Sequence, residues 1–263
     1  MIGLFAKTLR DQRRALIGWG IGLAAVAATY AAFYPSIENS AADFTGYLEK
    51  LPEAVRNVIG ADFTTPAGYL RSETFSLLGP ILFLVFAIGA GARAIAGEEE
   101  DGTLDLLLST PIRRRQLLVD KVGAMVVTAA ALAAVLFLTL SVVGPPFDLT
   151  VPPVDLASAC LMLLLVGLAF GAIAFPVGCA TGHRGLALGV TGAFAVFSYV
   201  TNAIAPSVDA LGWLRPLSPF RWYLHPDPLV AGIEPVNVVV LLGVVAAGYV
   251  VAWLTFDQRD LAA

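Results

Sequence analysis

Charged residues are scarce in this chain: Asp, Glu, Lys and Arg make up 14% of its 263 residues, whereas an average soluble domain contains about 25% of them. Hydrophobic residues instead make up 58%. A soluble protein would leave much of that apolar surface in water, where large patches drive association. A membrane span needs about 20 mainly apolar residues. The composition therefore excludes an ordinary soluble protein and predicts a polytopic membrane protein with a single transmembrane domain, residues 1–263.

Cysteine and histidine are also rare, with two of each. Cys160 and Cys179 both fall inside apolar stretches, which excludes a disulfide framework or a zinc cluster. The sequence contains no P-loop motif G-x-x-x-x-G-K-S/T, no G-x-S-x-G nucleophile elbow and no H-E-x-x-H metal motif. We therefore expect no catalytic residue, no metal and no cofactor in this chain. The net charge of -4 is too small to indicate a nucleic-acid partner.

Six apolar stretches are long enough to span a bilayer, and none of them contains Asp, Glu, Lys or Arg. Each is a continuous apolar run and lacks the alternation of a barrel strand. Because a chain in hydrocarbon must satisfy its own backbone polar groups, we expect each run to form a helix, which predicts an all-α fold. The predicted spans are 16–34, 75–92, 122–143, 156–180, 186–206 and 237–256.

Basic residues are distributed unevenly between the two sides that six spans create. With both termini inside, eleven of the sixteen Lys and Arg residues lie on the inner side and five on the outer side. Cytoplasmic segments carry an excess of Lys and Arg, so this asymmetry predicts cytoplasmic termini. The inner residues are Lys7, Arg10, Arg13, Arg14, Arg93, Arg113, Arg114, Arg115, Lys121, Arg184 and Arg259, and the outer residues are Lys50, Arg56, Arg71, Arg215 and Arg221.

This orientation assigns the long connections to opposite sides of the membrane. Segments 35–74 and 207–236 are predicted to be external, and the loop 97–121 to be cytoplasmic. Residues 1–15 alternate apolar and basic positions at helical spacing, which is typical of a helix lying among lipid headgroups. The acidic pI of about 5.1 and the richness in Ala and Gly favour a prokaryotic source, and hence a multi-pass protein of its plasma membrane.

Small residues form a row in the fourth predicted span, at Gly167, Gly171 and Ala174. Such a row permits close approach of another helix. That helix belongs either to a neighbouring span or to a second subunit, and the sequence leaves both interpretations open.

The cytoplasmic loop combines an acidic cluster, a leucine face and a basic cluster. Gly102 is expected to break the chain after the second span, and Thr103 to cap a turn that places three leucines on one face. The leucines are Leu104, Leu107 and Leu108. Thr110 followed by Pro111 is typical of an N-cap and the first position of a new helix. Such a loop is either a solvated surface whose arginines touch anionic lipid, or a docking platform whose leucines enter a groove on a cytoplasmic partner.

This segment resembles the coupling region of ABC-2-type permeases, the membrane subunits of ATP-binding-cassette exporters. In that family the second span is followed by acidic residues, then Gly-Thr-Leu-acidic-Leu-Leu-Leu, a small residue, Thr-Pro and a basic stretch before the third span. The six-span layout and the basic amphipathic start extend a weaker resemblance over the whole chain. The matching residues are Glu98, Glu99, Glu100, Gly102, Thr103, Leu104, Asp105, Leu106, Leu107, Leu108, Ser109, Thr110, Pro111, Arg113, Arg114 and Arg115.

The resemblance implies a permease subunit with the ABC-2 fold that pairs with a second permease copy or homologue and with two ABC-type ATPase subunits on the cytoplasmic face. ATP-Mg would be held by the ATPases, and residues 98–115 would transmit their closure to the second and third spans. Glu98, Glu99 and Glu100 would contact ATPase side chains. Residues 1–15 look like the family's interfacial entry helix, in contact with membrane lipids. An apolar cavity lined by spans two and five would suit the export of lipids or hydrophobic drugs.

Two other functions stay open on the residues alone. A membrane scaffold or assembly protein would recruit partners through the same loop without ATP-dependent transport. An intramembrane enzyme is less favoured, because the apolar stretches contain no Ser/His or acidic pair. The absence of charged groups from these stretches also argues against a proton- or sodium-coupled transporter.

Overall fold

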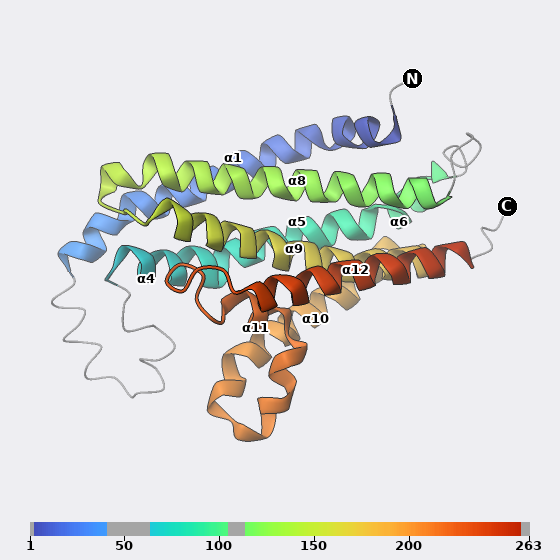
Figure 1. Cartoon of the computed structure of the whole chain (residues 1–263). Coiled ribbons are helices and arrows are strands. Elements are labelled where there is room, and N and C mark those ends of the chain that lie inside the picture. Colours follow the sequence, from blue (N-terminus) through green and yellow to red (C-terminus); the bar gives the residue numbers. More distant parts are fainter. Residues whose placement is uncertain (1–2, 41–63, 105–113, 259–263) are drawn as a thin grey trace.

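The computed structural model describes residues 3–40, 64–104 and 114–258. Every regular element in these ranges is a helix, and no described residue lies in a β-strand. Six helical segments are long and apolar enough to cross a membrane, and they form an elongated bundle (Figure 1). The predicted all-α architecture with six spans is therefore confirmed.

Each predicted apolar stretch falls in one of the six spanning segments, and the fifth stretch continues for two residues into a short 3-10 helix, η3. The segments are α1 (Leu4–Asn39), the combined helix of α4 (Pro66–Leu70), η1 (Arg71–Leu78) and α5 (Gly79–Arg93), α8 (Arg114–Val143), α9 (Pro153–Thr181), α10 (Arg184–Ile204) and α12 (Pro235–Asp257). The connections contain α6 (Ala96–Glu100), η2 (Pro145–Phe147), η3 (Ala205–Ser207), η4 (Asp209–Leu217) and α11 (Pro219–Leu224).

Five of the six spanning segments are longer than the apolar stretches that predicted them, and α10 has the same length as its stretch. Arg71 and Glu73, for example, lie inside the helical segment Pro66–Arg93, within its π-helical part η1. Arg and Glu are good helix formers, so a charged residue ends an apolar run without ending the backbone helix. The loops between spans are correspondingly shorter than the sequence pattern indicated.

The π-helix of the second span gives way to α5 at Gly79. The backbone N–H of Gly79 donates to the carbonyl of Thr74, a bond that spans five residues. A β-carbon at position 79 would lie 2.4 Å from that same carbonyl oxygen. Only glycine fits this close approach without displacing the backbone.

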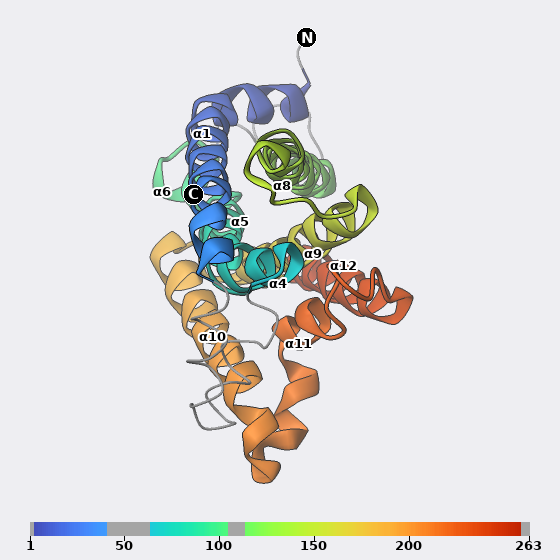
Figure 2. The ribbon, with the colours of Figure 1, turned by 90° about the vertical axis from the view of Figure 1, so that its left-hand side faces the viewer.

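From Leu4 onward, the predicted entry helix and the first predicted span belong to one continuous helix, α1. Figure 2, which looks along the bundle, shows that the first turns of α1 run across its end before the helix turns along the bundle. The remainder of α1 packs on α8. The start of α1 and the end of α12 both lie at this end of the bundle (Figure 1), as an even number of spans requires.

Helix α9 lies at the centre of the bundle and contacts α5, α8, α10 and α12. Its row of small residues faces α5 of the same chain: a β-carbon at Gly91 would lie 2.3 Å from the carbonyl oxygen of Gly171. On the opposite side, a β-carbon at Gly248 of α12 would lie 2.2 Å from the carbonyl oxygen of Ala172. Both neighbours thus approach the α9 backbone more closely than any side chain allows, which increases van der Waals contact between the helices.

At the bundle end opposite the termini, the segment between α10 and α12 is attached to other spans by side-chain hydrogen bonds. The buried Tyr223 hydroxyl donates to the carbonyl of Phe75 at 2.7 Å. Asn237 Nδ2 donates to the carbonyl of His225 at 2.8 Å, and Arg71 pairs with Asp227 at 3.4 Å. These contacts hold α11 against the start of the second span.

Candidate functional site

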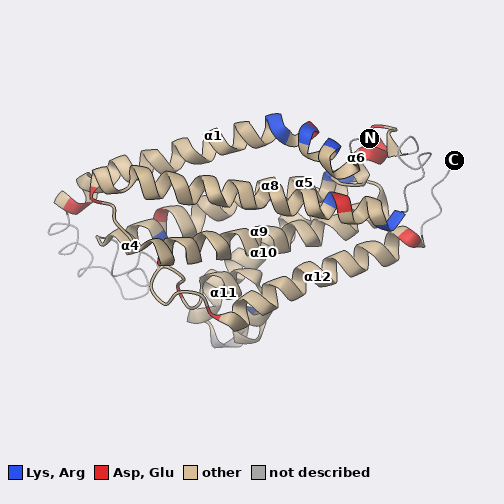
Figure 3. Cartoon of the chain, turned by 45° about the horizontal axis from the view of Figure 1, so that its top comes forward, with Lys and Arg blue, Asp and Glu red and all other residues tan. Residues whose placement is uncertain are grey.

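The described coupling residues lie at the bundle end where α1 begins and α12 ends, and Figure 3 shows many of the charged residues there. Those described are Glu98, Glu99, Glu100, Gly102, Thr103, Leu104, Arg114 and Arg115. Those outside the described residues are Asp105, Leu106, Leu107, Leu108, Ser109, Thr110, Pro111 and Arg113. The structure therefore shows the two ends of the coupling segment, one on α6 and one at the start of α8.

The acidic cluster forms the short helix α6, and the turn after it is closed by glycine. Gly102 has a φ of +67°, in the left-handed region that a residue with a β-carbon rarely adopts. This conformation lets the N–H of Thr103 donate to the carbonyl of Glu98 at 2.8 Å, an arrangement typical of helix C-termini. The chain thus breaks at Gly102 as its sequence indicated.

Glu98 is held by two side-chain hydrogen bonds. It accepts hydrogen bonds from the ammonium group of Lys121, on α8, and from the hydroxyl of Thr103. Burial alone would raise the pKa of Glu98, but these two hydrogen bonds and the charges of Lys121 and Lys7 outweigh it and hold the pKa below its usual value. Glu98 is therefore ionised at neutral pH and neutralises a lysine whose side chain is only 9% exposed.

Lys121 is a site residue that the sequence analysis counted only among the inner basic residues. Its spacing of 23 positions from Glu98 gives no local signal of pairing, because the partners lie on different helices. The one available indication was its position: Lys121 directly precedes the third apolar stretch, where an unpaired ammonium group would be costly.

Glu100 joins α6 to a third spanning helix. Its Oε1 accepts from the backbone N–H of Arg184, the first residue of α10, at 2.8 Å. The first N–H groups of a helix have no partner within the helix, so a carboxylate there satisfies a free donor and favours the helix dipole. Together, Glu98 and Glu100 connect α6 to α8 and α10, while the chain itself connects α6 to α5.

Of the three residues of the leucine face, the structure describes Leu104. Leu104 is 3% exposed and packs in a cluster with Ile95, Leu117, Phe175 and Phe256 of the same chain. Its side chain is therefore buried among the chain's own helices and does not present a free face. A docking role for Leu107 and Leu108, which lie outside the described residues, stays a prediction.

The two described arginines of the basic cluster contact the C-terminal helix. The guanidinium of Arg114 donates to the carbonyl of Phe256 at 3.3 Å and lies 5.7 Å from the centre of the Phe256 ring. The guanidinium of Arg115 lies 5.6 Å from the centre of the Trp253 ring. Both distances are within the range of cation–π attraction. The start of α8 is thereby attached to the end of α12.

A polar cavity of about 390 Å³ lies between these elements. Its walls come from α1, α5, α6, α8 and α10, so it adjoins each of the helices that α6 connects. Its charged lining residues are Asp11, Arg93, Glu98, Glu100, Asp101, Lys121 and Arg184. No group of three or more His, Cys, Asp or Glu side chains within the described ranges could hold a metal ion.

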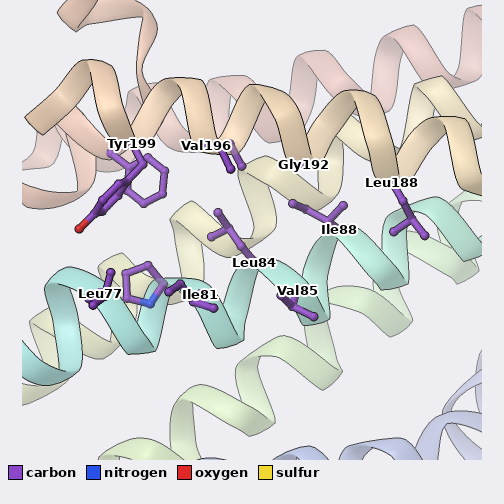
Figure 4. A pocket seen from close by; sticks show the side chains of 12 residues that line it. Leu77, Ile81, Leu84, Val85, Ile88, Leu188, Gly192, Val196 and Tyr199 are labelled. Atoms are coloured by element: carbon purple, nitrogen blue, oxygen red, sulfur yellow. The ribbon is translucent and has the colours of Figure 1, made fainter.

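A second, apolar cavity of about 430 Å³ lies between the second span and α10. Figure 4 shows Ile81, Leu84 and Val85 of α5 on one side and Leu188 and Val196 of α10 on the other. Tyr199 and Phe220 line its end nearer α11. The predicted apolar cavity between spans two and five is therefore present, and its walls suit an apolar ligand.

The comparison with protein families agrees with this architecture. A sequence model of the family described as "ABC-2 family transporter protein" matches residues 2–261, nearly the whole chain. A search of the curated proteins finds no match. Members of this family are the membrane components of transporters that associate with ABC ATPase subunits. The chain therefore belongs to the ABC-2 transporter family and is a multi-pass membrane permease subunit of an ABC transporter.

Proposed function

We propose that this permease exports a hydrophobic compound across a prokaryotic cell membrane, using ATP that separate ATPase subunits bind and hydrolyse. The ATPases would bind at the bundle end that holds both termini, which faces the cytoplasm in this proposal. ATP-Mg would be held entirely by those partners, and this chain would convert their movement into a rearrangement of its spans.

The observation that carries the proposal is the attachment of α6 to several spanning helices at once. Glu98 binds Lys121 of α8, Glu100 binds the start of α10, and Ile95 packs against α9 and α12 residues in one buried cluster. A partner that displaces α6 therefore acts on helices that line the apolar cavity, α5 and α10. A packed, hydrogen-bonded element of this kind transmits a displacement and does not absorb it.

The apolar cavity supplies the path for a hydrophobic substrate. It lies between α5 and α10, the two helices that α6 contacts through the chain and through Glu100. Its walls carry leucine, isoleucine and valine side chains, with Tyr199 as the polar exception at one end. Ligand sites of this kind recognise apolar shape and use few polar groups to set orientation.

A second permease copy fits the open side of this cavity. Ile81, Val85 and Val196 line it and yet are 47%, 55% and 66% exposed in the single chain. In a membrane these side chains face either lipid or another protein surface. A second copy packed on this face would close the cavity into a path between the two subunits.

The decisive experiment separates ATP hydrolysis from transport. Glu100→Ala removes the acceptor that holds the start of α10, so we expect the complex with its ATPase in lipid vesicles to hydrolyse ATP while moving several-fold less substrate per ATP. Glu100→Gln retains a side-chain oxygen and is the matched control, expected to transport more per ATP than the alanine variant. The readout is the ratio of substrate flux to phosphate released.

An unchanged ratio in Glu100→Ala would contradict this role of α6. Absence of any ATP-dependent flux in the wild-type complex, with the ATPase still bound, would favour the membrane scaffold instead. Loss of ATPase binding in both variants would show that Glu100 is needed to assemble the complex. That result would also contradict its proposed role in transmitting movement to α10.

A further inference from the structure

Three cavities adjoin one another along α5, and the chemical character of their lining residues changes from each cavity to the next. The polar cavity shares Gln12, Arg93 and Arg184 with a middle cavity of about 340 Å³. The middle cavity in turn shares Val85 and Leu188 with the apolar cavity. From the termini end towards the bundle centre, the lining therefore passes from carboxylates to arginines and then to aliphatic side chains.

The middle cavity is suited to an anion attached to an apolar group. Arg93 and Arg184 line it, and none of its lining residues is acidic. The Nε atom of Arg184 is buried and has no hydrogen-bond partner among the described residues. Trp19 and Phe86, whose rings pack edge to face at 6.1 Å, form an apolar wall beside these groups. An arginine with an unused donor beside an apolar wall is a site for a phosphate on an apolar chain.

The polar cavity adds carboxylates on the side away from the apolar chain. Asp11 and Asp101 line it, are exposed, and form no ion pair within the described part of the chain. Glu98 is already neutralised by Lys121. A simple anion would be repelled by the two free aspartates. A group that carries an ammonium beyond its phosphate would instead be attracted by them.

We propose that the three cavities together bind an aminophospholipid: one of its acyl chains in the apolar cavity, its phosphate at Arg93 and Arg184, and its primary amine near Asp11 and Asp101. The order of groups in such a lipid, amine then phosphate then hydrocarbon, is the order of the cavity linings. This inference rests on the proposed function in one respect, since it names the substrate class of that exporter. Binding itself requires no ATPase.

The test measures lipid retention by native mass spectrometry of the purified full chain. Phosphatidylethanolamine, phosphatidylglycerol and phosphatidylcholine with identical acyl chains are offered at equal concentration. We expect phosphatidylethanolamine to be retained about tenfold over each of the others, since one charge-assisted hydrogen bond changes affinity by about that factor. Phosphatidylglycerol lacks the amine, and phosphatidylcholine lacks the N–H donors of the amine.

Variants that remove charge test binding of the phosphate and of the amine of the headgroup separately. Arg184→Gln and Arg93→Gln are each expected to reduce retention of phosphatidylethanolamine about tenfold. The double variant Asp11→Asn with Asp101→Asn is expected to bring phosphatidylethanolamine and phosphatidylglycerol to equal retention. Arg221→Gln is the control, because Arg221 lies in α11 and stacks on Trp222.

Substitutions at two glycines test whether the apolar cavity binds the lipid, at positions where an added side chain does not disturb the fold. A β-carbon at Gly192, in the apolar cavity, or at Gly243, on α12, meets no atom within 4 Å. Gly192→Leu should fill the cavity and lower lipid retention several-fold, whereas Gly243→Leu should not. The soluble headgroup phosphoethanolamine, added as a competitor, should displace the lipid only weakly.

Several results would overturn the proposal: equal retention of the three lipids, preference for phosphatidylglycerol, no change in the arginine variants, or full displacement by phosphoethanolamine at lipid concentration. Each leaves the proposed function intact if ATP-dependent flux of another hydrophobic compound is measured. Conversely, selective binding of phosphatidylethanolamine without ATP-dependent movement would contradict the proposed function alone.

Discussion

Glu98 and Lys121 connect α6 to α8 through one ion pair, and its stabilising effect depends on pH. Glu98→Gln removes the charge that neutralises the nearly buried Lys121, and an uncompensated polar group of this kind costs about 1–3 kcal/mol. The pKa of Glu98 lies below its usual 4.5 in the folded chain. A lowered folded-state pKa stabilises the protein fully above the unfolded value and loses that effect as the pH falls through the folded value.

We therefore expect wild-type protein to unfold at a higher temperature than Glu98→Gln at neutral pH, and the difference to shrink below a pH of about 4.5. Thermal unfolding of both proteins in the same detergent at a series of pH values measures this. The double variant Glu98→Gln with Lys121→Met should recover part of the loss, since it removes the unpaired charge. A difference that is independent of pH would contradict the ion-pair explanation.

Two glycines on α5 differ in whether a side chain fits at their position, and only the packing around each one distinguishes them. A β-carbon at Gly91 would lie 2.3 Å from the Gly171 carbonyl, whereas one at Gly89 meets no atom within 4 Å. Gly91→Ala should destabilise the fold by about 1–3 kcal/mol through overpacking. Gly89→Ala should be neutral or slightly stabilising because alanine favours the helix. Equal unfolding temperatures for the two variants would show that α5 and α9 are not in close backbone contact.

At the scale of elements, Leu104 after α6 is buried, whereas the docking role of Leu107 and Leu108, outside the described residues, is a prediction. Leu104→Asp places a charge in the cluster around Ile95 and Phe256, so we expect loss of folded protein. Leu107→Asp with Leu108→Asp should leave insertion and folding intact and abolish association with the ATPase. Size-exclusion chromatography and co-purification measure the two effects. Normal co-purification of the ATPase with the double variant would exclude a docking role for these leucines.

The amphipathic spacing of Leu104, Leu107 and Leu108 predicted one common face, and of these residues the structure describes Leu104, which is buried. Periodicity determines which side chains lie on the same side of a turn. It does not determine whether that side meets solvent or the rest of the chain. Leu104 follows the left-handed Gly102 and the attachment of Glu98 to α8, and its packing against other helices decides that its side chain is buried.

For the whole molecule, the sequence predicts that both termini face the cytoplasm. The structure places the start of α1 and the end of α12 at the same end of the bundle (Figure 1). A fluorescent protein that folds only in the cytoplasm, fused after Ala263, should therefore fluoresce. A periplasmic phosphatase reporter fused at the same position should be inactive. The opposite pair of results would reverse the orientation and would place α6 beyond the reach of a cytoplasmic ATPase.

Local chemistry determined the six helices, since each apolar run in hydrocarbon must pair its own backbone groups within one helix. The sequence was also sufficient to indicate the family, because the residues of the coupling motif are contiguous. Only the tertiary structure decided that the small-residue row of α9 faces α5, that Lys121 binds Glu98, and that Leu104 is buried. These contacts depend on the rotation and tilt of whole helices against one another, which bring together residues far apart in sequence.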